Sequence, residues 1–498
     1  MSDRITVDVV IVGSGMGGAT LAAGLAPTGA RILILERGEQ LLDTPETRDA
    51  RAIFQRGFFR PDETWRGGDG QKFNPGNYYY VGGNSKFYGA VLMRYRAEDF
   101  RPIAHRQGTT PGWPFAYDEL EPWYGRAEAL YQVRGALGGD PTEPRHSTPY
   151  AHAPVPDEPA IARARTRMAS VGLHPSPLPL GVDIEAWLKR APTPWDAFPD
   201  ARTGKMDAET CGLASALAHP NVTLRTGARV ERLILAPDGK RLEGVVCQIG
   251  GESHTINAKN IVLAAGAVKS AELLLRSSEQ GVANCSGMVG RNFMNHNLSA
   301  VIAIDPRALN DSVYQKTLAI NDFYLGDGAG GPPLGNIQLL GRVSGAILKG
   351  DLRSVPQVLL DWVSRHSVDW LAMSEDLPNP ESRVTLDGAG LRLDWRRSNW
   401  AAHLALVKTL KERLRAAGYP IVLSRAFDRR TPSHQCGTVR IGLDAATAPL
   451  DPHCRAFDHP NLFVVDASFL PTSAAVNPSL TIAAQALRVA EHISRNDL

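Results

Sequence analysis

Apolar and polar residues alternate in blocks near the start of the chain, and these blocks predict a β–α–β unit. Residues 7–12 are β-branched and apolar apart from Asp8, which is typical of a strand buried in a parallel sheet. A glycine-rich turn follows, and then a segment with small residues such as Ala22, which suit a helix packed closely on that sheet. Residues 31–35 form a second apolar run, and Glu36 stands at its end.

The turn inside this unit has the spacing of a dinucleotide-binding loop. Gly13, Gly15 and Gly18 match the pattern G-x-G-x-x-G between the first predicted strand and the helix. Glycines permit the tight turn and the approach of a pyrophosphate, and the helix N-terminus adds partial positive charge there. A carboxylate at Glu36 can accept hydrogen bonds from a ribose diol. The unit predicts dinucleotide binding, and by itself it leaves FAD and NAD open.

Similar patterns return later in the chain. Residues 221–235 alternate like a pair of strands, and residues 259–278 again read as a strand, a turn at Gly266 and a helix. Residues 299–426 differ, because short alternating strands there surround an amphipathic helix at about 400–417, which favours an antiparallel sheet with helices.

The predicted fold class is therefore α/β plus α+β, a Rossmann-like dinucleotide-binding domain with a discontinuous antiparallel-sheet substrate domain. Six prolines between Asp140 and Ala160 exclude a helix and predict an extended excursion. We expect a discontinuous cofactor domain (1–95, 205–298 and 430–498), a Pro-rich excursion that contributes to the substrate domain (96–204), and a substrate domain (299–429).

Composition narrows the class of protein without naming a function. The 498 residues are 43% hydrophobic and 21% charged, with a formal net charge of +2, which favours a globular protein without a nucleic-acid surface. The five cysteines are widely spaced and form no C-x-x-C pair, so neither a metal site nor a disulfide framework is expected. The chain has no 18-residue apolar run, so we expect no membrane span and a cytoplasmic location.

The C-terminal region carries two polar residues with two possible roles. His434 precedes a Gly-Thr pair in "HQCGT", and Asn477 stands directly before Pro478 and a helical apolar pattern. The local pattern at Asn477 favours a helix cap, with asparagine at the N-cap and proline at the first helical position. The alternative is that the amide points into a reaction site.

The order of motifs along nearly the whole chain resembles the glucose–methanol–choline (GMC) oxidoreductase family of flavoproteins. The resemblance rests on "GSGMGG…LERG", "GGNSKFYGA", "GAVKSAELLLRS", "VGRNFMNH", "HQCGT" and "VVDASFLPTSAAVNPSLTI". The "GGN" loop and the "NPSLTI" ending look most like bacterial members related to pyranose and cholesterol oxidases.

The resemblance implies a cofactor, FAD, and a role for each matching residue. His434 matches the active-site histidine, and Asn477 matches the second catalytic position, so the amide would serve chemistry as well as capping in part. Some relatives attach FAD through a histidine in the "GGN" loop. Lys86, Phe87 and Tyr88 stand there in this chain, so non-covalent FAD is expected. The remaining cofactor contacts implied are Gly13, Gly15, Gly18, Glu36, Arg37, Gly83, Asn84, Ser85, Val230, Asp466, Ala467 and Pro478.

The implied reaction is oxidation of CH–OH to C=O on a sugar, glycoside or polyol-like substrate. A neutral imidazole at His434 would take the hydroxyl proton as hydride leaves for the flavin, and Asn477 would orient the alcohol. Two alternatives stay open: a dehydrogenase subunit that passes electrons to a partner or a quinone, and a non-redox flavin-bound lyase. The electron acceptor, O2 or another, and the oligomeric state are not predicted.

Other polar residues have simpler interpretations. His296, in "VGRNFMNH", is interpreted as structural, and Cys436 as a small buried apolar group. Glu375 and the nine tryptophans are assigned no role in the site.

Overall fold

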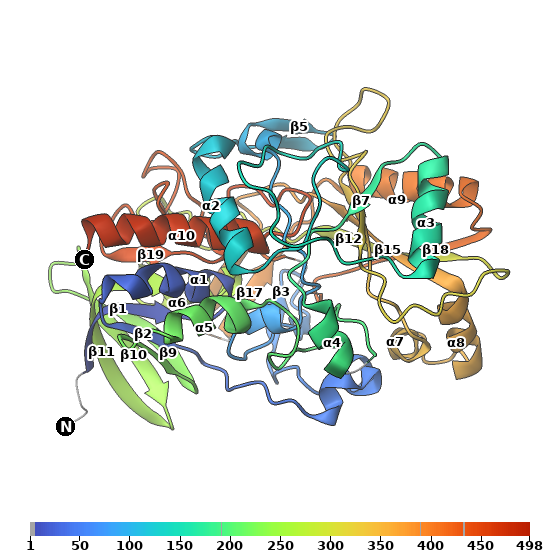
Figure 1. Ribbon diagram of the computed structural model, residues 1–498. Coiled ribbons are helices and arrows are strands. Elements are labelled where there is room, and N and C mark those ends of the chain that lie inside the picture. Colours follow the sequence, from blue (N-terminus) through green and yellow to red (C-terminus); the bar gives the residue numbers. More distant parts are fainter. Residues whose placement is uncertain (1–4, 191, 389, 432–433) are drawn as a thin grey trace.

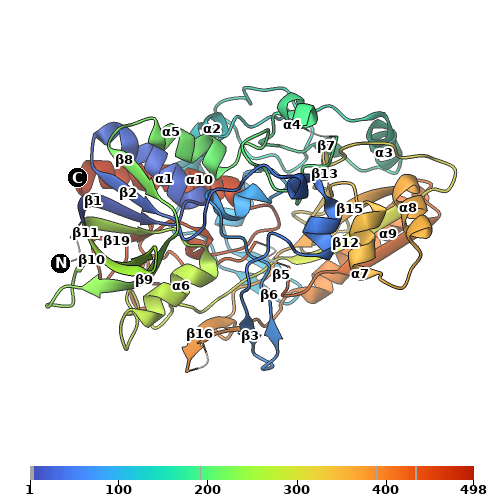
Figure 2. The same ribbon diagram turned by 90° about the horizontal axis from the view of Figure 1, so that it is seen from below.

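The computed structural model describes residues 5–190, 192–388, 390–431 and 434–498. It arranges them around two large sheets that lie side by side, one with α1 and α10 on the left of Figure 1 and one with α9 on the right. Figure 2 shows the same arrangement from below. The Rossmann-like unit and the separate antiparallel sheet confirm the predicted fold class.

The first sheet carries the predicted β–α–β unit. Its strand order is β8-β2-β1-β11-β10-β9, and β19 pairs with β11. β1 runs parallel to β2 and to β11, with Val10 opposite both Leu33 and Ile261, so apolar side chains fill the centre of the sheet. The strands are β1 (Ile5–Val12), β2 (Ile32–Leu35), β8 (Val222–Arg225), β9 (Ala228–Leu235), β10 (Leu242–Ile249), β11 (Glu252–Leu263) and β19 (Leu462–Val464).

Two strands predicted as a pair are not paired. Residues 221–235 form β8 and β9 as expected, but β8 pairs with β2 and β9 pairs with β10, so they lie at opposite ends of the strand order. Local alternation predicts strands, whereas the partner of each strand depends on the rest of the sheet.

Two helices from opposite ends of the chain pack together beside this sheet. α1 (Met16–Leu25) contacts α10 (Ser479–Asn496), and a Cβ at Gly24 would lie 2.6 Å from the Cβ of Ala490. Small residues at this crossing allow the two backbones to approach closely, which places both helix N-termini beside the same space between the sheets.

The second sheet is antiparallel where its long strands meet, in the order β18-β12-β15-β14-β13-β7. Val301 and Trp370 face α9 in an apolar core, and their neighbours Ala300 and Leu371 face the opposite way, as the period of two requires. The strands are β7 (Pro175–Pro177), β12 (Asn297–Ile304), β13 (Leu318–Ile320), β14 (Asn336–Leu339), β15 (Ser367–Ser374) and β18 (Ile421–Ala426), and the helix is α9 (Trp400–Ala416).

The remaining elements surround these two units. The predicted extended excursion is free of helix up to Glu158, but Pro159 opens α3, because proline is tolerated at the first position of a helix. None of the described helices is long and apolar enough to cross a membrane. The other elements are β3 (Trp65–Gly67), β4 (Lys72–Phe73), β5 (Ile103–His105), β6 (Gly108–Thr110), β16 (Arg383–Asp387), β17 (Gly390–Asp394), α2 (Tyr117–Leu130), α3 (Pro159–Ser170), α4 (Ile184–Arg190), α5 (Ala214–Leu217), α6 (Ala267–Arg276), α7 (Gly345–Asp351) and α8 (Gln357–His366).

Candidate active site

A cavity of about 1190 Å³ extends from the glycine-rich turn to the second sheet. Gly15 and Glu36 line one end, His434 and Asn477 line the middle, and Leu371 lines the far end. Pockets for one small molecule hold roughly 300–1,000 Å³. This cavity therefore has room for a dinucleotide and a second, smaller molecule.

Two glycines of the motif have different surroundings: Gly15 faces the cavity, and Gly18 packs closely against the turn. A Cβ at Gly15 would have no atom within 4 Å, so the space beside it is open for a ligand at the N-terminus of α1. A Cβ at Gly18 would lie 2.0 Å from the carbonyl oxygen of Gly13, so Gly18 permits contact between helix and turn. Gly13 and Gly15 line the cavity, whereas Gly18 supports them from behind.

Glu36 is held in place at the end of β2. Its Oε2 accepts hydrogen bonds from the amide of Ser14 (3.0 Å) and from the Ser14 hydroxyl (2.7 Å), and its Oε1 accepts one from the amide of Gly38 (2.9 Å). Burial raises the pKa of Glu36, and these hydrogen bonds oppose that rise. The carboxylate therefore ties β2 to the glycine turn, in addition to lining the cavity.

Four further predicted cofactor residues line the same cavity, one on a strand and three just after the ends of two other strands. Val230 is on β9, and Arg37 follows β2 with its guanidinium 3.8 Å from the centre of the Tyr79 ring. Asp466 and Ala467 follow β19. Asp466 Oδ2 accepts hydrogen bonds from the Gly266 amide (3.0 Å) and from a serine hydroxyl on α6, so it fixes the second strand–turn–helix unit.

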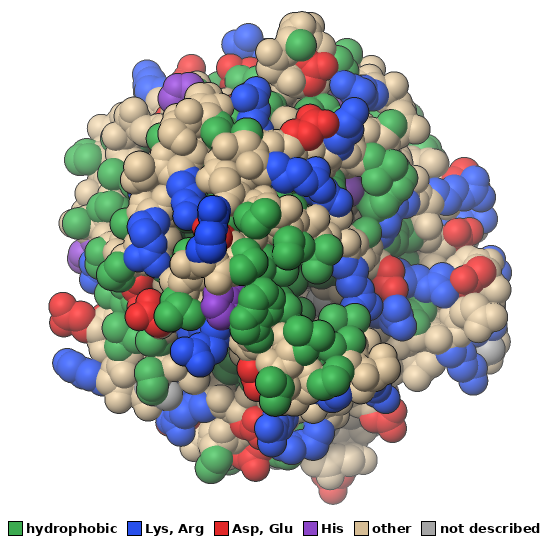
Figure 3. All heavy atoms as spheres, turned by 90° about the vertical axis from the view of Figure 1, so that its right-hand side faces the viewer, with side chains coloured by type: hydrophobic (Ala, Val, Ile, Leu, Met, Phe, Trp, Pro, Cys, Tyr) green, Lys and Arg blue, Asp and Glu red, His purple; other side chains and the backbone are tan. Residues whose placement is uncertain are grey.

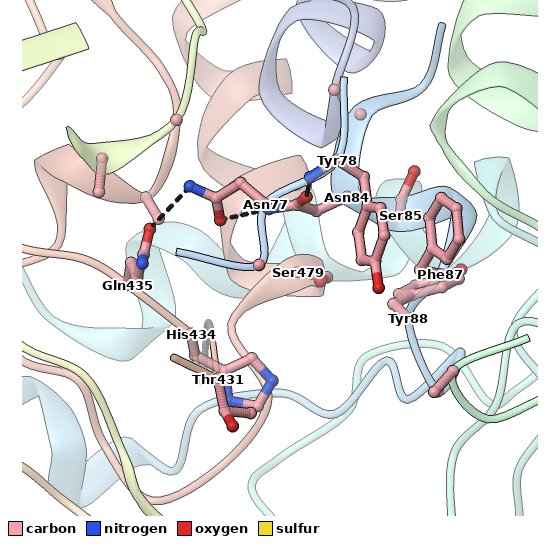
Figure 4. Close-up of a pocket in the computed structure, with 18 of the residues that line it drawn as sticks. Asn77, Tyr78, Asn84, Ser85, Phe87, Tyr88, Thr431, His434, Gln435 and Ser479 are labelled. Carbon is pink, nitrogen blue, oxygen red and sulfur yellow. Dashed lines mark hydrogen bonds between the residues drawn. The ribbon is translucent and has the colours of Figure 1, made fainter. Parts of the chain in front are cut away.

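The "GGN" loop forms the wall between the two ends of the cavity. Gly83, Asn84 and Ser85 all line it. Asn84 Oδ1 accepts a hydrogen bond from the Tyr78 amide (2.9 Å), and Asn84 Nδ2 donates to Asn77 (3.4 Å). Figure 4 shows Asn77 reaching onward to Gln435, next to His434 in the chain. The loop is thereby connected to the segment that carries the histidine.

His434 lies directly opposite a second histidine that we interpreted as structural. Met294 and Cys436 exchange two backbone hydrogen bonds of 3.0 Å as an antiparallel pair. His296 lies two residues after Met294, and His434 lies two residues before Cys436, so the two rings face each other. Their Nδ1 atoms are 2.8 Å apart. This contact corrects the interpretation of His296, which belongs to the site.

The contacts of His296 determine where the protons lie. Its Nε2 is 3.0 Å from the carbonyl oxygen of Ser473 and 2.8 Å from that of Ala474, and carbonyl oxygens only accept. Nε2 of His296 therefore carries the hydrogen, and its Nδ1 accepts the Nδ1–H of His434. The lone pair of His434 is then on Nε2, the atom nearest Asn477.

Asn477 does not cap the helix. The N-cap of α10 is Pro478, and the helix begins at Ser479, so the expected capping role of Asn477 is wrong. The amide Nδ2 lies 3.3 Å from His434 Nε2 and donates to it, and the amide Oδ1 accepts from Gln338 Nε2 at 3.0 Å. Pro478 lines the cavity beside Asn477.

Both histidines are neutral near neutral pH. Burial lowers the pKa of His434 well below its ordinary value of 6.5, and so do the repulsion that would arise if His296 were also protonated and the positive charge of Lys316. Burial likewise lowers the pKa of His296, which is only 2% exposed. A proton acceptor is therefore available at His434 Nε2 without deprotonation by another group.

Three site residues were not predicted: His296, Gln338 and Lys316. His296 is part of "VGRNFMNH", one of the motifs on which the family resemblance rests. That motif was the signal that could have pointed to His296. Gln338 and Lys316 come from the second sheet and its connections, where the sequence pattern predicts strands without indicating which side chains bond Asn477 or line the cavity.

A dinucleotide site that abuts a neutral histidine and an oriented amide defines a flavin- or nicotinamide-dependent oxidoreductase. The family comparison selects the flavin. Two sequence profiles described as GMC oxidoreductase match residues 194–298 and 378–486, and a profile of an NAD(P)-binding Rossmann-like domain matches residues 11–58. The chain belongs to the GMC oxidoreductase family, acts on alcohols, and takes FAD as its cofactor.

Several curated relatives align over nearly the whole chain. The 6'''-hydroxyparomomycin C oxidase of Streptomyces lividus is 32% identical, and the alignment covers 99% of this chain and 92% of that one. The paromamine 6'-oxidase of Streptomyces fradiae is 31% identical with the same coverage. The 2-methyl-1,2-propanediol dehydrogenase of Mycolicibacterium austroafricanum is 28% identical, over 98% and 95% of the two chains.

A solved structure supports the fold. Pyridoxine 4-oxidase from Mesorbium loti superposes with a TM-score of 0.68 at 21% identity, over 99% of this chain and 100% of that one. None of these comparisons tests the finer resemblance to pyranose and cholesterol oxidases, which stays a prediction.

Proposed function

We propose that this protein oxidises a CH–OH group of a small-molecule alcohol to C=O, with His434 as the base and Asn477 as the group that orients the alcohol. The single observation that supports this best is the pair of contacts of His434, whose Nδ1 lies 2.8 Å from His296 Nδ1 and whose Nε2 lies 3.3 Å from the Asn477 amide at the cavity. FAD, when bound, supplies an acceptor for the carbinol hydrogen and its electron pair.

The roles of the two side chains follow from their contact. The hydrogen bond from Asn477 to His434 is long at 3.3 Å, so a hydroxyl can replace it. An alcohol between the two groups donates its proton to His434 Nε2 and accepts a hydrogen bond from Asn477 Nδ2. As C=O forms, the oxygen gives up its proton to the imidazole, and the imidazolium retains its Nδ1–H bond to His296.

The residues at the other end of the cavity fit FAD. The open space beside Gly15 and the N-terminus of α1 suit a pyrophosphate. The N-terminus of α10, an 18-residue helix, borders the middle of the cavity through Pro478 and Ser479, where partial positive charge favours added electrons. The chain has no histidine in the segment Lys86, Phe87 and Tyr88, which supports non-covalent binding.

The sugar, glycoside or polyol expected from the sequence remains a candidate substrate. The printed names of two relatives specify aminoglycoside oxidation and that of a third specifies a diol, and these names describe those proteins. Acceptors other than O2 also remain possible for this chain.

Anaerobic reduction of the bound flavin tests the proposal. We expect alcohols to bleach the holoenzyme, and we expect His434→Gln to lower the rate of bleaching by about 10²–10⁴-fold while the FAD content stays normal. Retained reduction in this variant would remove His434 from the mechanism. Product formation without any flavin response would favour the lyase alternative, and activity with quinones or dyes but no peroxide would favour the dehydrogenase.

A further inference from the structure

The face of the second sheet that borders the cavity is apolar at its centre and polar on either side. One row of cross-strand neighbours runs from Gln338 to Leu371, then to Ala300, and ends at Arg425. All but Gln338 line the cavity directly, and Gln338 bonds Asn477, so one polar end of the row is at the amide and the other, Arg425, is on the edge strand β18. Between these two ends the row is aliphatic.

Neighbouring rows widen this apolar centre. Leu298 and Ile302 lie two residues on either side of Ala300, so they share its face, and Ile302 pairs with Leu423 on β18. Leu298, Leu371 and Met373 form an apolar cluster separate from the core behind the sheet. Apolar side chains that border an open cavity gain free energy only when something apolar covers them.

The apolar lining continues to the outside of the molecule. Leu423 and Leu352 both line the cavity and are 54% and 44% exposed. Beyond them, Val358 and Trp362 on α8 are also exposed. Figure 3, which views the side of Figure 1 where α7, α8 and β18 lie, shows hydrophobic side chains gathered near the centre of this face.

The carboxylates around the cavity all have partners within the protein. Asp196 Oδ2 is 2.8 Å from Lys316 Nζ, and Asp351 Oδ2 is 2.6 Å from Arg425 Nη1. At the cofactor end, Lys269 pairs with Glu63 and Glu272, and Glu36 accepts hydrogen bonds from Ser14 and Gly38. At the end of the cavity that the second sheet borders, the two described lining carboxylates, Asp196 and Asp351, each already pair with a cation. Arg342 is a further cation among the residues that line the cavity.

We propose that the substrate is an uncharged alcohol with an apolar aliphatic or alicyclic body, and that a polycationic amino sugar is a poor substrate. This inference rests on the proposed function, because it takes the carbinol to be held between His434 and Asn477. The rest of the molecule then lies over Leu371, Ala300 and Ile302. An amino sugar would bring ammonium groups beside Lys316 or Arg342, and the two described lining carboxylates at the second-sheet end already pair with cations, so charge complementarity disfavours it.

Two readouts on the holoenzyme separate the inference from the proposed function. Flavin reduction is followed anaerobically with cyclohexylmethanol, methyl glucoside and paromamine. Binding is followed by calorimetry with 1-methylcyclohexanol, a tertiary alcohol that cannot be oxidised, and with the two sugars. We expect cyclohexylmethanol to exceed paromamine at least tenfold in reduction efficiency, and the tertiary alcohol to bind more tightly than either sugar.

Each outcome has a defined meaning. Equal or better reduction by paromamine or methyl glucoside overturns the inference and leaves the proposed function standing. Tight binding of the tertiary alcohol without reduction by any oxidisable alcohol keeps the apolar site and overturns the proposed function. If the tertiary alcohol binds no more tightly than the sugars, the inference is wrong.

A pair of matched variants locates the site. Leu423→Asn introduces an amide at a half-exposed position on the cavity face, and Leu404→Asn does so at a position with similar exposure (53%) on α9, behind the sheet. We expect Leu423→Asn to raise the Kd of the tertiary alcohol about three- to tenfold, as partial loss of leucine contact predicts, and Leu404→Asn to leave it unchanged. Equal effects of the two variants would contradict the placement.

Discussion

His296 and His434 share one hydrogen between their Nδ1 atoms, which lie 2.8 Å apart. Two backbone carbonyls fix the hydrogen on the far side of His296, so the direction of the shared hydrogen bond is determined by the fold. A side chain that never borders the alcohol thus sets which nitrogen of His434 can accept a proton.

The first prediction concerns His296. His296→Leu removes the acceptor for the Nδ1–H of His434 and leaves that ring free to adopt the other tautomer. We expect the rate of flavin reduction to fall about tenfold or more, with FAD content unchanged, because His434 is then less often in the reactive form. His296→Gln, whose amide can still accept from His434, should recover part of the rate.

Nitrogen-15 NMR of histidine-labelled protein gives the independent readout. In the wild type, Nε2 of His434 should show the shift of an unprotonated nitrogen, and His296→Leu should show a mixture. A slow variant with an unchanged His434 spectrum would mean that His296 acts only through packing.

The second prediction is the pH dependence of flavin reduction. Because burial lowers the pKa of His434 below 6.5, its neutral, reactive form predominates above that pH and is lost as the pH falls through the lowered pKa. Stopped-flow rates at saturating alcohol should be flat from pH 7 to 9 and decline only below about 6.5. An acid limb with a midpoint above 7 would contradict a buried, neutral base.

The third prediction uses an isosteric change at Asn477. Asn477→Asp keeps the shape but replaces the donor with a carboxylate beside His434 Nε2. The negative charge favours imidazolium, so the pKa of His434 should rise and the acid limb of the rate should move to higher pH. At pH 7 we expect a rate loss of about 10²-fold, since both orientation and the free base are reduced.

Asn477→Ser, which retains a small hydrogen-bond donor without a charge, is the matched control. It should lower the rate without moving the acid limb. A shift of equal size in both variants would show that the charge is not its cause.

The fourth prediction separates the two roles in the glycine motif. Gly15→Ala places a methyl group in open space at a backbone conformation that alanine accepts (φ −69°, ψ −171°), so the apoprotein should unfold at an unchanged temperature while FAD affinity falls tenfold or more. Gly18→Ala places a methyl group against the Gly13 carbonyl and should destabilise the fold by about 1–3 kcal/mol.

Calorimetric unfolding of the apoprotein and FAD titration measure these two effects. Loss of apoprotein stability in Gly15→Ala, or normal stability in Gly18→Ala, would contradict the division of roles.

The sequence predicts local units well because their signals are local. The order of strand, glycine turn, helix and acid at Glu36 identifies the dinucleotide unit, and the motif around His434 predicts a base that lines the cavity. The pairing of β8 and β9 was wrong, because alternation specifies a strand but not its neighbour. The cap at Asn477 was also wrong, since Gln338 and His434 from distant segments bind its amide.

The contact between His296 and His434 could not be predicted from spacing along the chain. It depends on the register of one short backbone pair, Met294 with Cys436, between segments that are far apart in sequence. A shift of that pair by one residue would turn one ring away from the other. Such registers are set by tertiary packing.

The packing of α10 against α1 has a consequence for biosynthesis. When β19 and α10 emerge from the ribosome, a nascent chain has already produced the second sheet and every strand of the first sheet except β19, and the segment that carries Asn477 comes only after β19. Cofactor loading must therefore follow translation of α10. Premature stop codons upstream of this helix would yield chains that retain no flavin, however well their earlier segments fold.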